Sequence, residues 1–509
     1  MGLARIFDVH DSEPMSQPLP KNADARSKYS TVDKAADISI RNRSELVLAC
    51  AQVLHTNGQS THETVQAAER LGSELGLRVM VIPRWEALEL RAHDSIDTQI
   101  SFKPGSPTSV NMDRVASAMT TIENPDAGRL AIDAALENIK VIAHAPPAST
   151  WLFTLAAAAG AAAMAAIFGV RHLKAEVLIV LSAAAGAVLR RTLARYSANT
   201  LLQPFCAAVL AGMIGALAVR YNLSSSLRLV AVCPCMILVP GPHVLNGAMD
   251  LIAARINLGA SRLVYAGLII LAISVGLLLG MGLLSVGLPV GEPGRVVSLW
   301  LDVIAAGVAV AAFSVFFSIP LRMLGWPVAI GMLAHALRWG SLKAGTGIAT
   351  GALVACLSVG LILTPVARRW RMPFAAIGFA SVVSMMPGLF LFRTASGLVQ
   401  LTNNSNANFD LLRATIADAM SAITVILAMS FGVVAPKIII DRFGGSATPR
   451  DRDSPVSLIS APSCALPATA MQCSGSSAGK SAVRNKQDSQ SRLDNSGEPN
   501  SGIATGRRT

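Results

Sequence analysis

The sequence is short of charge. Only 15% of its 509 residues are Asp, Glu, Lys or Arg, whereas soluble proteins average about 25%. These charges crowd into residues 1–145 and 441–509, so the middle of the chain is strongly apolar. The composition excludes an ordinary soluble protein. It predicts a membrane protein with many spans, preceded by a soluble head and followed by a polar tail.

Motifs for metal, redox and nucleic-acid chemistry are also scarce. The seven cysteines show no disulfide framework or zinc spacing, and the closest pair, Cys233 and Cys235, is one residue short of C-x-x-C. The head contains neither H-E-x-x-H nor G-x-S-x-G. The net charge is +12, but Lys and Arg are scattered rather than gathered in a stripe. We therefore expect no metal, no cofactor and no nucleic-acid partner, and a transporter rather than an enzyme.

The first residues, Met1 to Asp8, carry no apolar core long enough for a signal peptide. We therefore expect the head to lie in the cytoplasm. Basic loop residues divide equally between the two sides of the membrane. Lys140, Lys437 and Arg442, beside the first and last spans, favour a cytoplasmic location for both termini.

Residues 1–42 have no apolar periodicity and are expected to be disordered. The apolar periodicity of residues 43–145 predicts a small cytoplasmic α+β head domain. Its second helix should begin at Ser60, whose hydroxyl can accept from the Glu63 amide while the Glu63 side chain reaches back. The expected elements are helices over 44–55, 60–76, 111–122 and 126–142, and a meander of strands over 77–83, 87–93 and 98–102.

The apolar region predicts an α-helical polytopic fold of about ten spans. Five segments fall in residues 150–288 and five in 296–440, and the segment 325–339 is the shortest. An odd number of spans per half makes the second half enter the membrane in the opposite direction, so inverted repeats follow. Residues 444–509 are Ser-rich and expected to be disordered.

Two helix breaks stand out within these spans. Pro240, Gly241 and Pro242 interrupt the fourth segment of the first half, and Pro387 and Gly388 interrupt the fourth segment of the second half. Backbone groups freed in lipid survive only where they are buried in protein or line a cavity. Paired broken helices are a pointer to a transporter's substrate site. We therefore expect these five residues to bind substrate.

Three polar side chains follow the first break at helical spacing. His243, Asn246 and Asp250 would share one face of the restarted helix. We assign His243 and Asn246 to substrate binding, and Asp250 and His243 to proton coupling, because a carboxylate and an imidazole within a span are costly unless they face a cavity or partner. The alternative is that Asp250 is solvated at the interface and His243 is satisfied by a free carbonyl.

Arg393 follows the second break and could hold a substrate carboxylate, although snorkelling to lipid headgroups is the favoured interpretation. Asp302, His335 and Asp418 also lie within apolar segments. Each can be an interface residue or a satisfied polar group.

These residues resemble the threonine/serine exporter family of bacterial membrane proteins. The resemblance covers residues 43–440 and is carried by the stretch from Leu54 to Glu63, by Leu238-Val239-Pro240-Gly241 and by Pro387-Gly388. This sequence differs from the family's pattern at His62, where the family has a basic Arg-like position, and in its long Ser-rich tail.

The resemblance implies proton-driven export of threonine and serine across the bacterial inner membrane. Some members of the family resemble dicarboxylate exporters instead, so a succinate-like substrate is an alternative. A second alternative is a membrane-anchored hydrolase acting through the head. The partners implied are the amino acid, protons and the lipid bilayer, and a homo-oligomer is left open.

Overall fold

The computed structural model describes residues 26–123, 132–170, 172–197, 199–221, 227–286, 297–370, 372–403 and 409–443. All of these belong to one compact unit, Met1–Ser446. The predicted tail, residues 444–509, lies outside the described residues.

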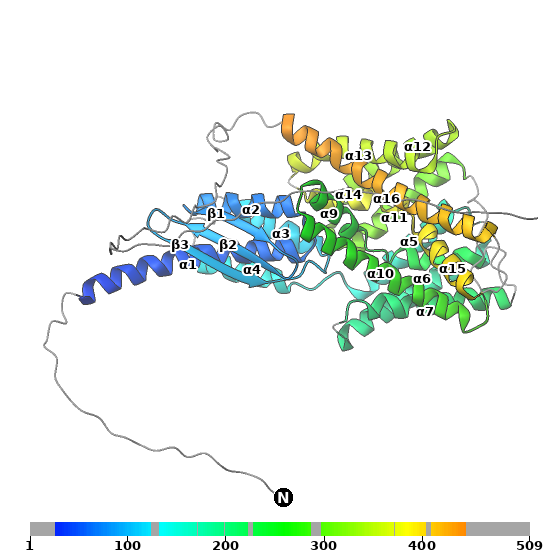
Figure 1. Ribbon diagram of the computed structural model, residues 1–509, viewed down its shortest axis with the longest axis horizontal. Helices are drawn as coiled ribbons and strands as arrows, with labels where there is room; N and C mark the ends of the chain where they lie inside the picture. The colour runs from blue at the N-terminus through cyan, green and yellow to red at the C-terminus, as the bar shows by residue number, and fades with distance from the viewer. Residues whose placement is uncertain are drawn as a thin grey trace, which may run out of the picture. The chain divides into compact units, whose positions relative to one another are not determined.

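The N-terminal region is built from helices and a small sheet, as Figure 1 shows in blue and cyan. Strand β1 pairs antiparallel with β2, and β2 with β3, which confirms the predicted meander. Helices α1 and α2 pack on this sheet. The elements are α1 (Arg26–Thr56), α2 (Thr61–Glu74), β1 (Arg78–Pro83), β2 (Ala87–His93), β3 (Thr98–Pro104), α3 (Met112–Glu123) and α4 (Ile132–His144).

Two details of this region differ from expectation. Helix α1 begins at Arg26, so it takes in residues 26–42, which were expected to be disordered. At the start of α2 the Ser60 hydroxyl accepts from the Glu63 amide at 3.4 Å, as predicted. The Glu63 carboxylate does not reach back, however, because it pairs with Lys437 at 2.9 Å. Only half of the predicted capping box forms.

The apolar region is entirely helical among the described residues, which supports a polytopic membrane protein. Seven helices are long and apolar enough to cross a membrane, or nine if each bent pair forms one span. The seven are α5 (Thr150–Ile167), α6 (Leu173–Tyr196), α7 (Leu202–Arg220), α10 (Ile256–Gly282), α11 (Leu299–Phe316), α13 (Ile348–Trp370) and α16 (Phe409–Phe443).

The described residues thus give up to nine candidate spans, so the predicted count of ten is not confirmed. The remaining expected segment, residues 325–339, forms α12 (Gly325–Lys343), which is not among the helices apolar enough to span. The reason is its polar content, since α12 carries His335, Arg338 and Lys343.

Both predicted helix breaks are confirmed. Helix α8 (Leu227–Met236) and α9 (Gly241–Ile252) meet at a bend of 56° around Pro240. Helix α14 (Phe374–Val382), with the short 3-10 turn η3 (Val383–Met385), meets α15 (Gly388–Asn403) at a bend of 54° around Pro387. A second 3-10 turn, η2 (Leu321–Met323), precedes α12.

The helices of the two halves have corresponding packing partners. In the first half α6 packs on α5 and α7, and α7 packs on α10. In the second half α12 packs on α11 and α13, and α13 packs on α16. Helices α5 and α11, the first of each half, pack on each other. The bent helices of the two halves also touch, α9 against α14 and α8 against α15.

Candidate functional site

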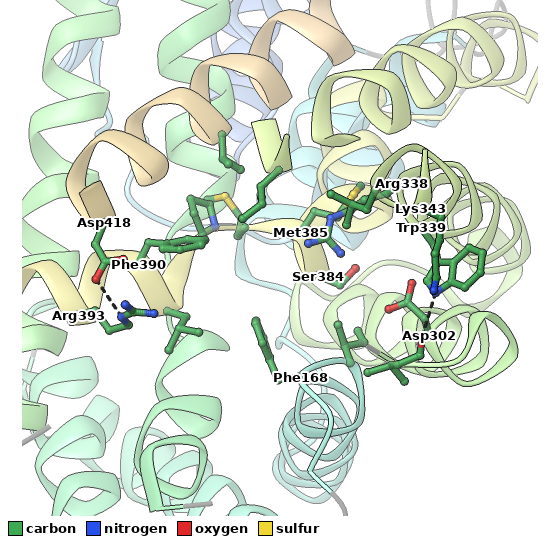
Figure 2. A pocket seen from close by; sticks show the side chains of 18 residues that line it. Phe168, Asp302, Arg338, Trp339, Lys343, Ser384, Met385, Phe390, Arg393 and Asp418 are labelled. Atoms are coloured by element: carbon green, nitrogen blue, oxygen red, sulfur yellow. Dashed lines mark hydrogen bonds and ion pairs between the residues drawn. The ribbon is translucent and has the colours of Figure 1, made fainter. Parts of the chain in front are cut away.

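The second break opens onto a cavity with a volume of about 570 Å³, called the main cavity below. Pro387 lines it, together with residues of α11, α12, η3, α15 and α16. Most of the lining is apolar, as is usual for small-molecule sites. Figure 2 shows the polar side chains among them, which are Asp302, Arg338, Trp339, Lys343, Ser384, Arg393 and Asp418.

One end of the cavity carries an ion pair between the two helices that follow the break. Arg393 of α15 lies 2.9 Å from Asp418 of α16, measured from Nε to Oδ2. Their side chains are only 12% and 7% exposed. The buried pair rules out the favoured interpretation that Arg393 snorkels to the headgroups. A substrate group can compete with either partner.

The other end of the cavity carries a chain of hydrogen bonds, and Figure 2 shows Asp302, Ser384 and Arg338 gathered there. His335 is fully buried, with Nδ1 3.0 Å from Asp302 Oδ2 and Nε2 2.7 Å from Ser384 Oγ. With the ring proton on Nδ1, the imidazole donates to the carboxylate and accepts from the hydroxyl. This carboxylate, imidazole and hydroxyl can hold and pass on a proton.

The same end also carries basic side chains. The nearby carboxylate of Asp302 attracts the positive charge of Arg338 and offsets part of the cost of removing that charge from water. Lys343 lies over the ring of Trp339, at 5.3 Å, and the indole of Trp339 donates to the Val297 carbonyl at 2.9 Å. The cavity thus presents three cationic and two carboxylate side chains to a ligand.

The first break is packed rather than open. A Cβ atom on Gly241 would lie 1.7 Å from Phe379 Cζ, and the void beside Gly241 measures about 20 Å³. Pro242 and His243 are buried, and the His243 ring meets Tyr265 edge-on at 5.1 Å. These residues are not among those that line the main cavity.

The face of α9 that was expected to meet substrate contacts the N-terminal region instead. Asn246 donates to the Gly58 carbonyl at 3.0 Å. Asp250 accepts from the Thr61 hydroxyl at 2.9 Å and lies 3.1 Å from Arg262 Nε. Asp250 is also 3.7 Å from Arg255 and only 2% exposed, so it is not solvated at an interface.

The residues assigned from sequence therefore do not form one site. Pro387 and Arg393 line the main cavity, and Gly388 follows Pro387. Gly241 packs against Phe379 of α14, whereas Asn246 and Asp250 contact the N-terminal region. Sequence reasoning did not single out Arg338 or Ser384. The only signal for Arg338 was its place, one helical turn after His335, in the least apolar predicted span.

Within the described residues, no group of three or more His, Cys, Asp and Glu side chains is arranged to hold a metal ion. The buried cysteines, such as Cys233 and Cys235, are free thiols packed in the apolar core.

Comparison with known proteins places both halves in one family. Residues 45–284 match the family described as "Putative threonine/serine exporter", and residues 302–439 match "Threonine/Serine exporter, ThrE". A relative from Mycobacterium tuberculosis (strain ATCC 25618 / H37Rv), named "Probable threonine/serine exporter", is 23% identical over 391 residues, covering 74% of this chain and 73% of the relative. No solved structure matches the chain. The chain, a multi-pass membrane protein, belongs to the threonine/serine exporter family.

Proposed function

We propose that the protein exports threonine and serine across the bacterial inner membrane and holds the amino acid in the cavity at the second break. The observation that carries this proposal is the cavity of about 570 Å³ with carboxylates and cations at both ends. Its volume lies in the range of about 300–1,000 Å³ found for small-molecule sites. An amino acid carries one group of each sign, which matches this lining.

The N-terminus of α15 adds a second attraction for the substrate carboxylate. The helix begins at Gly388, directly after the proline. The Gly388 amide donates to the Met386 carbonyl at 2.9 Å, whereas the next two amides, of Leu389 and Phe390, lie in the first turn, where an α-helix supplies no intrahelical partner. Such a helix end carries partial positive charge and favours anions. Arg393 lies one to two turns further on and can bind a carboxylate with two parallel hydrogen bonds.

The charges also distinguish the amino acid from a dicarboxylate. Two of the three cations already have a carboxylate nearby, Arg393 with Asp418 and Arg338 with Asp302. A dicarboxylate would need two cations with no such neighbour, and would face the repulsion of Asp302 and Asp418. The substrate ammonium, in contrast, gains from those carboxylates. We therefore favour threonine and serine over succinate.

We propose that protons drive export through Asp302, His335 and Ser384. Two of these residues line the cavity, and His335 joins them by hydrogen bonds of 3.0 and 2.7 Å. The two ring nitrogens of His335 face different partners, so the imidazole can accept a proton on one side and release one on the other as the substrate comes and goes. Asp250 and His243 remain the second candidate, and both lie outside the cavity.

The proposed topology has two five-helix repeats of opposite direction, with both termini and the N-terminal α+β domain in the cytoplasm. The matching packing partners of α5–α10 and α11–α16 support the repeat. So does the occurrence of one proline-centred bend in each half.

The function is tested by reconstituting the full chain in lipid vesicles and following labelled threonine, serine and succinate. We expect saturable threonine and serine transport that responds to a pH gradient, with succinate neither moved nor competing. Succinate transport that threonine does not inhibit would favour the dicarboxylate alternative. Cleavage of threonine peptides by the protein, without transport, would favour the hydrolase alternative.

A further inference from the structure

A small void lies against the first broken helix in the same way that the main cavity lies against the second. The void measures about 10 Å³, which is room for about one water molecule. It is lined by Pro234, Ile237 and Leu238, which lead into the first break, and by Ser182 and Arg190 of α6.

The void and the main cavity occupy corresponding places in the two halves. The offset that sets Pro240 opposite Pro387 sets Ile237 opposite Ser384, and Leu238 opposite Met385. It also brings the Arg190–Arg191 pair of α6 opposite Leu337 and Arg338 of α12. Ser384, Met385 and Arg338 line the main cavity. Their counterparts Ile237 and Leu238 line the void, and so does Arg190, the neighbour of the Arg338 counterpart Arg191.

Arg190 has donors that no described residue uses. Its Nε and Nη1 atoms are buried without a hydrogen-bond partner, and the hydroxyl of Ser182, two helical turns away on the same side of α6, is also buried without one. The guanidinium lies 5.1 Å from the Phe316 ring and 5.8 Å from the Phe153 ring. These contacts stabilise the positive charge but use none of its N–H groups. A buried cation without an anion is costly within a span, and is a functional hypothesis for that reason.

We propose that Arg190 and Ser182 form a second binding site for the substrate carboxylate, used when the protein faces the opposite side of the membrane. The proposal rests on the proposed amino-acid transport. In inverted-repeat transporters, access alternates as one repeat rocks or gates against the other. The void then opens along the first break as the cavity at the second break closes, and the carboxylate pairs with the unused donors of Arg190.

The test measures the KM for threonine separately at each membrane face, with the full chain in oriented vesicles. Arg190→Gln should raise the KM at one face about tenfold or more, and change it less than twofold at the other. Arg338→Gln should show the reverse pattern. Arg195→Gln, exposed near the end of the same helix, is the matched control for loss of charge and should affect neither face.

Arg190→Lys keeps the cation near the rings and removes the fork of donors, so it should give a smaller rise at the same face. An unchanged KM at both faces, or equal rises at both faces with a lower Tm, would overturn the second site. If the unmodified protein moves no threonine, the proposed function itself fails. If the unmodified protein transports threonine and Arg190→Gln leaves the KM unchanged at both faces, only the second site is overturned.

If Arg190→Gln does not fold, the opening of the void is tested by labelling the Ser182→Cys variant with a thiol reagent. The other cysteines of the chain are replaced for this experiment. The thiol should react with a small polar reagent only while a threonine gradient holds the protein in the opposite-facing state. Equal labelling with and without the gradient would contradict the opening of the void.

Discussion

The ring of Phe379 lies where a side chain at Gly241 would have to begin, since a Cβ atom there would be 1.7 Å from Phe379 Cζ. Gly241 opens α9 in the first half, and Phe379 belongs to α14, which precedes the second break. The two broken helices are therefore in direct contact without an intervening layer. A movement of one cannot leave the packing of the other unchanged, which is a requirement for two sites that open in turn.

Gly241→Ala should destabilise the protein because the new methyl group meets a buried ring. We expect a loss of about 1–3 kcal/mol, the usual cost of overpacking, seen as a lower Tm in detergent. Gly388→Ala is the matched control at the second break. Its Cβ would lie 3.2 Å from Cγ of Met236, a flexible side chain that can move aside. Equal Tm values for the two variants would contradict the close contact.

The ion pair of Arg393 and Asp418 should separate stability from transport. Arg393→Gln or Asp418→Asn alone leaves a buried charge uncompensated, so each should cost about 3 kcal/mol or more and abolish transport. The double variant Arg393→Gln/Asp418→Asn should regain most of the Tm but not the threonine transport. A double variant that transports normally would show that the pair is only structural.

The local features could be predicted from sequence because they depend on neighbouring residues. Pro240 and Pro387 break their helices by losing a backbone donor, and the strand pattern from Arg78 to Pro104 pairs in sequence order. The spacing of Asn246 and Asp250 also placed them correctly on one face. What that face meets could not be predicted, since Gly58 and Thr61 lie almost 190 residues earlier in the chain.

The main cavity could be predicted only in part for the same reason. Asp302, His335 and Ser384 come from three segments, and none has a neighbour in sequence that indicates the others. Hydropathy even weakened the prediction of α12 as a span, because His335, Arg338 and Lys343 make that helix polar. Two of these three, Arg338 and Lys343, line the cavity, and His335 bonds to Ser384, which also lines it.

His335→Gln should weaken the dependence of threonine efflux on the pH gradient. The Gln amide keeps a hydrogen-bonding group between Asp302 and Ser384 but cannot take up and release a proton. Efflux down a threonine gradient should therefore continue, and a pH gradient should accelerate it only slightly. Asp250→Asn, tested in the same vesicles, should leave the pH response intact. The opposite result, with only Asp250→Asn losing the response, would return proton coupling to the first half.

The stability of the protein should fall on mild acidification because of His55. Burial, with a smaller contribution from the positive charge of Arg262, lowers the pKa of His55 from 6.5 to about 3. The unfolded chain takes up a proton below pH 6.5, whereas the folded protein does not until about pH 3. This contribution to stability is complete above pH 6.5 and declines by about 1.4 kcal/mol for each pH unit below it.

His55→Gln should flatten that decline between pH 6.5 and 4, because Gln takes up no proton in this range. The Gln amide can still donate to the Arg84 carbonyl, which Nε2 of His55 contacts at 3.1 Å. The measurement is the Tm as a function of pH. His144→Gln, at an exposed position, is the control. A decline of equal slope in the His55→Gln variant would mean that other groups cause it.

The contact of Thr61 with Asp250 should hold the N-terminal region against α9. Thr61→Val removes the 2.9 Å hydrogen bond and leaves the buried carboxylate with one partner fewer. If the lost hydrogen bond contributes about 1 kcal/mol to the free energy of local opening, hydrogen exchange of the amides in residues 58–64 should become roughly fivefold faster. Thr64→Val is the matched control, since the Thr64 hydroxyl, equally buried on the same helix, donates only to the local Ser60 carbonyl. If both valine variants exchange at the same rate, the bond to Asp250 does not hold this interface, and the Asn246 bond to Gly58 becomes the next to test.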